Sequence, residues 1–272
     1  MSLHLSLHTQ PEVPLEADCI CPDKIQPLKS NEIPTMTVFH GNRQVELGEF
    51  FDCKGNFDGQ ITIDGDLANV KHLGASMSFG KIIVNGDTGL HTGAGMRGGE
   101  IIIEGNTADW LGAEMLNGKI IVKGDAGHMT GSGYRGSTIG MQGGEIIVHG
   151  NVKNETGHVM RRGLIAVGGN SGDFTGVNML AGTIIVLGKM GIRTGAGMKR
   201  GSIISFSEAD LLPTFSRNCE YSPAFIKFYL GYLEKNGFLF DSSHLNSTFE
   251  RWSGDSIEIN RGEILLSKHK NK

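Results

Sequence analysis

The sequence lacks the features that mark nucleic-acid-binding, secreted and membrane proteins. Its 25 Lys and Arg against 29 Asp and Glu give a formal net charge of −4, which favours neither nucleic acid nor an anionic membrane as a partner. No apolar run approaches the ~18 residues that cross a bilayer. Residues Met1 to Gln10 alternate Leu with His or Ser, which predicts an edge strand and not a signal peptide. We therefore expect a cytoplasmic protein that binds no nucleic acid and no membrane.

Motifs for catalysis and metal binding are missing as well. The four cysteines form no CxxC pair and no zinc-type set, which favours reduced thiols. The ten histidines are scattered, none of them at HxH or HExxH spacing, and no GxGxxG lies between a strand and a helix. The sequence therefore predicts no catalytic, metal-binding or cofactor-binding residue in this chain.

Glycine, in contrast, is abundant, at 41 of 272 residues against a usual level near ~7%. One glycine precedes each of eight short apolar segments, and the steps between these glycines are 21, 19, 19, 26, 19, 19 and 19 residues. A period near 19 is too short for a strand–helix–strand unit and fits one coil of a parallel β-helix. Glycine suits the corners of such a coil because it adopts a positive φ at little cost. The sequence predicts an all-β fold, a right-handed parallel β-helix of about eight coils. The eight glycines are Gly59, Gly80, Gly99, Gly118, Gly144, Gly163, Gly182 and Gly201.

A methionine recurs with the same rhythm, once between each pair of successive segments. Its steps are 19, 19, 26, 19, 19 and 19 residues, so seven of the eleven methionines belong to one ladder. A methionine stacked on its equivalent in the next coil predicts core filling rather than metal binding. The seven are Met77, Met96, Met115, Met141, Met160, Met179 and Met198.

Alternation along the apolar segments predicts which side chains point inward. In KIIVN, Ile82 and Val84 point inward, whereas Lys81 and Ile83 point outward. The first outward residue alternates in charge from coil to coil, and the middle one is apolar in almost every coil. A parallel sheet that is apolar on both faces needs cover on both, supplied by the C-terminal segment or by a partner protein.

The repeat divides the chain into three parts. Residues 1–58 are predicted to form an N-terminal cap, residues 59–207 the coils, and residues 208–272 a C-terminal segment with a helix at about 222–236. Apolar or aromatic residues make that helix amphipathic and the first candidate for covering the late coils; they are Phe225, Phe228, Tyr229 and Tyr232.

One coil is longer than its neighbours by seven residues, YRGSTIG, at 134–140. Interruptions of a solenoid are where recognition loops usually lie. Tyr134 can stack on a ring, and Arg135 can hold a carboxylate in two parallel bonds. The insertion is thus a candidate binding or docking loop, the alternative being a bulge that only packs against the C-terminal segment.

The tandem TGAGM…GG…IIIEGN coils resemble the family named for its GxGxG motif. That family includes the C-terminal domain of the glutamate synthase large subunit and the C subunit of formylmethanofuran dehydrogenase. The phrases QPEVPLEADCICPDKI, VELGEFFDCKG and the YRG insertion are similar to this C subunit, and the tail LLPTFSRNCEYSPAFIKFYLGYLEKNG resembles its bacterial branch.

The resemblance implies a structural, connecting subunit of the formyltransferase/hydrolase complex. That complex transfers the formyl group between formyl-tetrahydromethanopterin and methanofuran and hydrolyses formylmethanofuran to formate. The alternatives are the C subunit of a molybdenum or tungsten formylmethanofuran dehydrogenase and, less favoured, an unrelated β-helix enzyme. The implied partners are the A, B and D type subunits, which would carry zinc, or a molybdenum or tungsten pterin in the alternative. Methanofuran would be handled by the complex.

The resemblance also implies a carrier with an acidic polyglutamate arm, for which basic residues are candidate contacts. Several of them follow the TGxxM phrase and would share one edge of the coils; solvated surface charges are the plainer interpretation. The candidate docking or carrier-binding residues are Tyr134, Arg135, Gly136, Arg97, Arg161, Arg162, Lys199 and Arg200.

Overall fold

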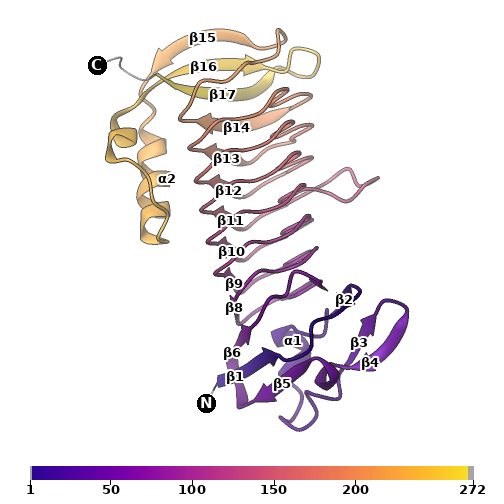
Figure 1. The fold of residues 1–272 in the computed structure, drawn as a ribbon. Helices are drawn as coiled ribbons and strands as arrows, with labels where there is room; N and C mark the ends of the chain where they lie inside the picture. The colour runs from indigo at the N-terminus through magenta and orange to yellow at the C-terminus, as the bar shows by residue number, and fades with distance from the viewer. Residues whose placement is uncertain (1, 269–272) are drawn as a thin grey trace.

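The structure, a computed structural model, describes residues 2–268. Strands make up most of its regular elements, which confirms the prediction of an all-β fold (Figure 1). The strands are β1 (Ser2–Leu7), β2 (Leu15–Glu16), β3 (Thr37–His40), β4 (Arg43–Glu46), β5 (Phe51–Lys54), β6 (Asn56–Asp64), β7 (Val70–Lys71), β8 (Lys81–Asn85), β9 (Glu100–Ile103), β10 (Lys119–Val122), β11 (Glu145–Val148), β12 (Leu164–Val167), β13 (Thr183–Val186), β14 (Arg200–Ser205), β15 (Ser216–Tyr221), β16 (Thr248–Gly254) and β17 (Arg261–Lys268). The helices are α1 (Pro22–Ile25) and α2 (Ala224–Lys235), with 3-10 turns at Leu47–Glu49 and Ser242–Asn246.

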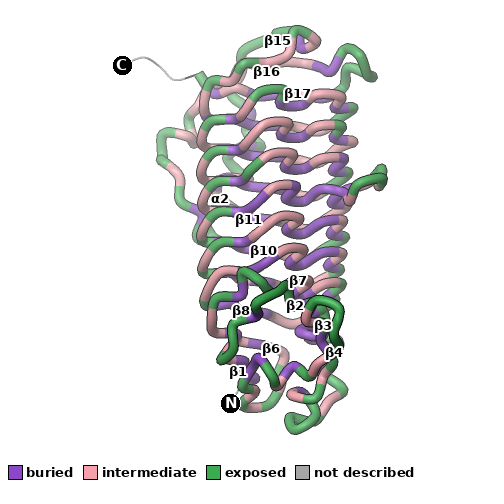
Figure 2. The backbone as a smooth tube through the Cα atoms, turned by 45° about the vertical axis from the view of Figure 1, so that its right-hand side comes forward, coloured by how far each residue is buried: buried purple, intermediate pink, exposed green. Residues whose placement is uncertain are grey.

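The repeated segments stack into one elongated column. Each of the eight contains one strand, β6 or one of β8 to β14, and each strand pairs in parallel and in register with the next, as in Ile82 with Ile101. A second ladder of bridges, from Leu67–Thr88 to Ser171–Met190, joins the other side of the coils. Figures 1 and 2 show the chain winding through this stack one coil at a time.

The inner face of the strands is the core of the column. Ile82 and Val84, which were predicted to point inward, are fully buried, and so are their equivalents in β9, β10 and β11. All seven ladder methionines are fully buried in the same cluster, as predicted. Figure 2 shows buried residues recurring at the same place in successive coils.

Glycine and methionine recur together because they touch. Gly99 has a φ of 78°, a left-handed conformation that favours glycine. A Cβ at this position would lie 2.5 Å from Cε of Met77, which comes from the preceding coil. Each methionine methyl group therefore fills the space that the missing side chain of the next coil's glycine leaves.

The outward charges pair across neighbouring coils, as their alternation predicts. Nζ of Lys81 lies 3.0 Å from Oε2 of Glu100, and Nζ of Lys119 lies 4.0 Å from Oε2 of Glu145. These side chains are partly exposed, so the pairs favour correct register more than they add to stability.

The outward apolar face of the later coils is covered by the chain's own C-terminal segment. Ile226, Leu230 and Leu233 of α2 pack against Ile147 and Ile185 on the strands. Figure 1 shows α2 alongside these coils. The side of α2 that packs against the strands is aliphatic. Of the four residues predicted for its apolar face, Tyr229 is half-buried against the same cluster and Phe228 is 79% exposed. Aliphatic side chains pack flat against a sheet of isoleucines, whereas the aromatic side chains lie at the edge of this contact.

The two ends of the chain join the same large sheet as the coils. Its order is β15-β16-β17-β14-β13-β12-β11-β10-β9-β8-β6-β1-β5, and a small sheet has the order β4-β3-β2-β7. The prediction of an edge strand near the N-terminus is wrong, because β1 pairs with β6 on one side and β5 on the other. Neither α1 nor α2, the helices within residues 2–268, is long and apolar enough to cross a membrane.

Candidate functional site

The insertion projects from the column on the side away from α2 (Figure 1). Contacts of Tyr134 fix its base to the coils. The Tyr134 hydroxyl lies 3.0 Å from Nδ1 of His91, and its backbone N–H donates to Oε1 of Glu114 at 3.2 Å. The centre of its ring lies 5.5 Å from that of His91 and 6.4 Å from that of Trp110. The predicted recognition residue thus acts as an anchor on the two preceding coils.

The Tyr134 ring packs against a row of stacked rings. His72, His91 and Trp110 occupy the same position in successive coils, with ring centres 4.7 and 5.2 Å apart. All three have a φ near +60°, which costs a residue other than glycine about 1–2 kcal/mol. Ring stacking offsets part of that cost. This row was not predicted from the sequence. The sequence does contain a signal for it, because each of these aromatic residues lies two residues before the glycine of a TG or LG phrase.

The rings around Tyr134 are held neutral near pH 7. Burial lowers the pKa of His91 to about 4, and His72 next to it adds to the shift. Burial lowers the pKa of His72 and raises the pKa of Tyr134 to about 12, with Glu114 adding to the effect. The cluster therefore stacks and shares the hydrogen bond between Tyr134 and His91 without presenting a charge.

Beyond this anchor, the tip of the insertion is open to solvent. Arg135 and Gly136 are exposed, and Arg135 makes no ion pair with any residue in the described part of the chain. The insertion therefore presents a free guanidinium from a fixed base.

The coils bring four of the predicted basic residues together. Arg161, Arg162, Lys199 and Arg200 line one hollow of about 460 Å³, whose other walls are Leu180, Ala181 and Ile259. Arg97 is exposed at the equivalent position three coils away. Tyr134, Arg135 and Gly136 are not among the residues that line this hollow. The predicted residues thus fall into two groups, the insertion and the basic hollow, with Arg97 apart from both.

A second hollow, which the sequence did not indicate, lies between α2 and the coils. It has a volume of about 630 Å³ and is lined by Phe225, Phe228, Tyr229 and Tyr232 of the helix together with Gly144, Glu145, Gly163 and Leu164 of the coils. Phe228 is 79% exposed. The Tyr232 hydroxyl donates to Oε2 of Glu145, which fixes the helix to β11.

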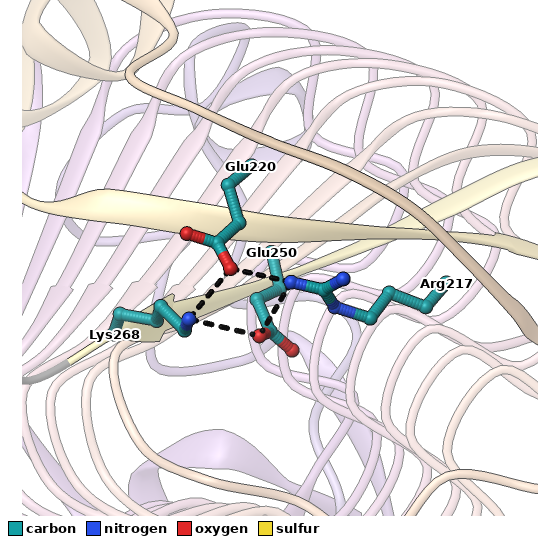
Figure 3. A network of polar contacts seen from close by, with 4 residues as sticks. All are labelled: Arg217, Glu220, Glu250 and Lys268. Carbon is teal, nitrogen blue, oxygen red and sulfur yellow. Dashed lines mark hydrogen bonds and ion pairs between the residues drawn. The ribbon is translucent and has the colours of Figure 1, made fainter.

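Figure 3 shows a ring of alternating charges on the outer C-terminal strands. Arg217 and Lys268 each contact both Glu220 and Glu250, with Nζ of Lys268 2.6 Å from Oε1 of Glu220 and 3.3 Å from Oε1 of Glu250. Partial burial opposes ionisation of Glu250, but hydrogen bonds from Arg217 and Lys268 outweigh it and lower the pKa of this carboxyl group. The ring joins β15, β16 and β17, and its two cations balance its two carboxylates, so none of these four charges is left to bind a ligand.

Cysteine thiols and possible metal ligands are the other side chains that could carry chemistry. Burial raises the pKa of Cys19 to about 12 and that of Cys21 and of Cys53 to about 11, so these thiols stay protonated near neutral pH. Within residues 2–268, no three His, Cys, Asp or Glu side chains are placed to hold a metal ion.

Comparison with known proteins gives relatives of one kind. A scan of protein families finds no match. The chain is 42% identical over 274 aligned positions to the C subunit of the tungsten-containing formylmethanofuran dehydrogenase 2 of Methanococcus maripaludis, a match that covers 99% of this chain and 98% of that one. It is 47% identical over 81 residues to the C subunit of the molybdenum-containing formylmethanofuran dehydrogenase 1 of Methanothermobacter marburgensis, covering 29% of this chain and 20% of that protein's length.

Among solved structures, the similarity extends along the whole chain. A chain of the X-ray structure of the formyltransferase/hydrolase complex from Methylorubrum extorquens, in complex with methylofuran, matches with a TM-score of 0.90 and 29% identity. The match covers 98% of this chain and 100% of that one. The C-terminal helix and strands are therefore included in the similarity together with the coils.

Proposed function

The chain belongs to the family of formylmethanofuran dehydrogenase C subunits, and from this premise we propose that it is the connecting subunit of a one-carbon enzyme complex. The complex would transfer the formyl group between formyl-tetrahydromethanopterin and methanofuran and hydrolyse formylmethanofuran to formate. The observation that carries this proposal is the full-length match to a chain of the formyltransferase/hydrolase complex. The buried thiols and the neutral His91 cluster support a structural role for this chain.

The architecture proposed for this role is a right-handed parallel β-helix of eight coils at residues 59–207. The in-register parallel strands support it, and right-handed crossover is the usual connection between parallel strands. Residues 1–58 would cap one end and residues 208–272 would cover the late coils and close the other. A rigid column of this kind can hold partner proteins at a fixed separation.

The partners would be the A, B and D type subunits, which would carry zinc and handle methanofuran. The alternative is the molybdenum or tungsten dehydrogenase, favoured by the 42% identity to a tungsten-containing relative along the whole chain. Purification of the complex through a tag on this chain, followed by metal analysis, separates the two. Zinc without molybdenum or tungsten, together with formyl transfer that needs no electron acceptor, would support the hydrolase complex. Molybdenum or tungsten with formate-dependent dye reduction would overturn it.

The insertion and the basic residues are proposed as docking or carrier-binding positions. Arg135 at the tip of the insertion and Arg162 in the hollow are exposed, so their removal should not unfold the protein. In the purified complex, Arg135→Ala with Arg162→Ala is expected to raise KM for a polyglutamylated carrier while kcat stays near the wild-type value. Unchanged kinetic constants would remove the carrier contact from the proposal and leave the docking role.

A further inference from the structure

The basic hollow is built by the regular spacing of the coils. The backbone N–H of Arg161 donates to the carbonyl of Met141, that of Leu180 to Met160, and that of Lys199 to Met179, at 2.7–2.8 Å. These equivalent bonds place the three residues in one row on successive coils. Since neighbouring strands lie ~4.8 Å apart, the pair Arg161–Arg162 is about 9.6 Å along the column from the pair Lys199–Arg200.

The charges of this row are poorly compensated within residues 2–268. Arg161, Arg162 and Arg200 make no ion pair there, and Lys199 approaches only Glu258, at 3.8 Å and with both side chains partly exposed. Arg200 also lies directly opposite Arg261 in the parallel pairing of β14 with β17, and both are exposed. Like charges directly opposite each other destabilise a sheet, so an anion bound here would remove a cost that the free chain carries.

Between the two basic pairs lies an apolar strip. Leu180 and Ala181 occupy the coil that separates the pairs, and Ile259, 47% exposed, forms one wall. A small inorganic anion would satisfy a single pair and leave this strip exposed to water. An occupant that fits the whole hollow has carboxylates at its two ends and apolar side chains between them.

We propose that the hollow binds an extended acidic segment of a partner protein in the polyproline II conformation, which runs along the column with carboxylates three residues apart. This conformation has three residues per turn and rises ~3.1 Å per residue, so carboxylates three residues apart lie on the same side of the segment, about 9.3 Å apart, and match two coil steps. The residues between the carboxylates lie over Leu180, Ala181 and Ile259. This inference rests on the proposed role as a subunit and names the chemistry of one contact.

Peptide binding to the full-length chain tests it without any other subunit. The probe is a fluorescent peptide with the core Glu-Pro-Val-Glu-Pro-Val-Glu, whose prolines favour the polyproline II conformation, and the matched control peptide has Gln in place of each Glu. The acidic peptide is expected to bind saturably at low salt and to weaken as salt rises, whereas the Gln peptide does not bind. Arg161→Gln, Arg162→Gln and Arg200→Gln combined should weaken binding about tenfold, and Arg43→Gln, exposed on β4 and outside the hollow, should leave it unchanged.

Three results would overturn the inference. They are the absence of saturable binding up to millimolar peptide, equal affinity of the wild type and the triple variant, and tighter binding of an oligoglutamate with a carboxylate on every residue. The last result would indicate a polyanionic carrier as the occupant. Because the assay uses the isolated chain, none of these results bears on whether the chain co-purifies with other subunits.

Discussion

The contact between each ladder methionine and the glycine of the next coil is the smallest repeating unit of this protein. It joins two residues about one period apart in the sequence, and it requires both a left-handed backbone and an absent side chain. A methionine adapts its flexible side chain to the gap that remains. The regular appearance of both residues in the sequence is therefore one packing constraint, repeated in each coil.

Comparing two glycines distinguishes the effect of close packing from the effect of the left-handed backbone. Gly59 and Gly118 both have a φ of 102°, but a Cβ at Gly118 would lie 2.8 Å from Cε of Met96 and 3.0 Å from backbone atoms of the preceding coil, whereas a Cβ at Gly59 would meet nothing within 4 Å. Gly118→Ala should lower the free energy of unfolding by about 1–3 kcal/mol more than Gly59→Ala, measured by urea denaturation. Equal losses would show that these close contacts at Gly118 add nothing.

His91 should titrate far from its usual range. Burial beneath Tyr134 places its pKa at about 4. Because the unfolded chain takes up this proton near pH 6.5, the contribution of His91 to stability falls as the pH drops from 6.5 to 4 and levels off below that. NMR titration of the imidazole should give the low pKa in the wild type and a higher one in Tyr134→Ala. A wild-type value near 6.5 would contradict the packing described for the insertion.

At the scale of elements, two buried apolar faces stabilise the column, one inside the coils and one between the coils and α2. Leu230 is fully buried between α2 and the strands, whereas Phe228, two residues earlier on the same helix, is 79% exposed. Leu230→Ala should lower the free energy of unfolding by about 2–4 kcal/mol, and Phe228→Ala by less than about 0.5 kcal/mol. Comparable losses in urea denaturation would show that the helix does not cover the coils through its aliphatic face.

The ring of charges on β15, β16 and β17 should make the stability of the protein depend on pH in the acid range. The pKa of Glu250 is lowered in the folded chain, so its contribution is complete above its unfolded pKa and is lost as the pH falls through the lowered value. The wild type should exceed Glu250→Gln in stability at pH 7, and the difference should shrink by pH 3. A difference that does not change with pH would mean that the ion pairs do not stabilise the sheet.

The coils could be predicted from the sequence because period, inward residues and alternating charges all repeat. The joining of β17 to β14 was missed, although RGEILL at residues 261–266 has the pattern of RGSIIS at residues 200–205, and Met198 contacts Gly262 as the other ladder methionines contact their glycines. A stretch of 55 residues without the repeat separates the two phrases, and a search for a fixed period does not cross it. Segments outside the repeat are placed by packing, which leaves no periodic signal.

At the scale of the whole molecule, the candidate sites follow from the register of the coils. The basic residues of the hollow were identified in the sequence, but their grouping needs the two-coil step that separates Arg162 from Arg200. The role of Tyr134 as an anchor was not predictable, because its partner His91 lies 43 residues away on another coil. The hollow beside α2 was missed because the sequence does not show which coils the aromatic residues of the helix lie beside.

Native mass spectrometry of the tagged chain, co-expressed with its neighbouring genes, tests whether this rigid column connects other subunits. We expect one assembly that contains this chain and its partner proteins in fixed stoichiometry, and dispersal of the partners when this chain is omitted. A chain that stays monomeric and fully soluble beside partners that assemble without it would contradict the claim.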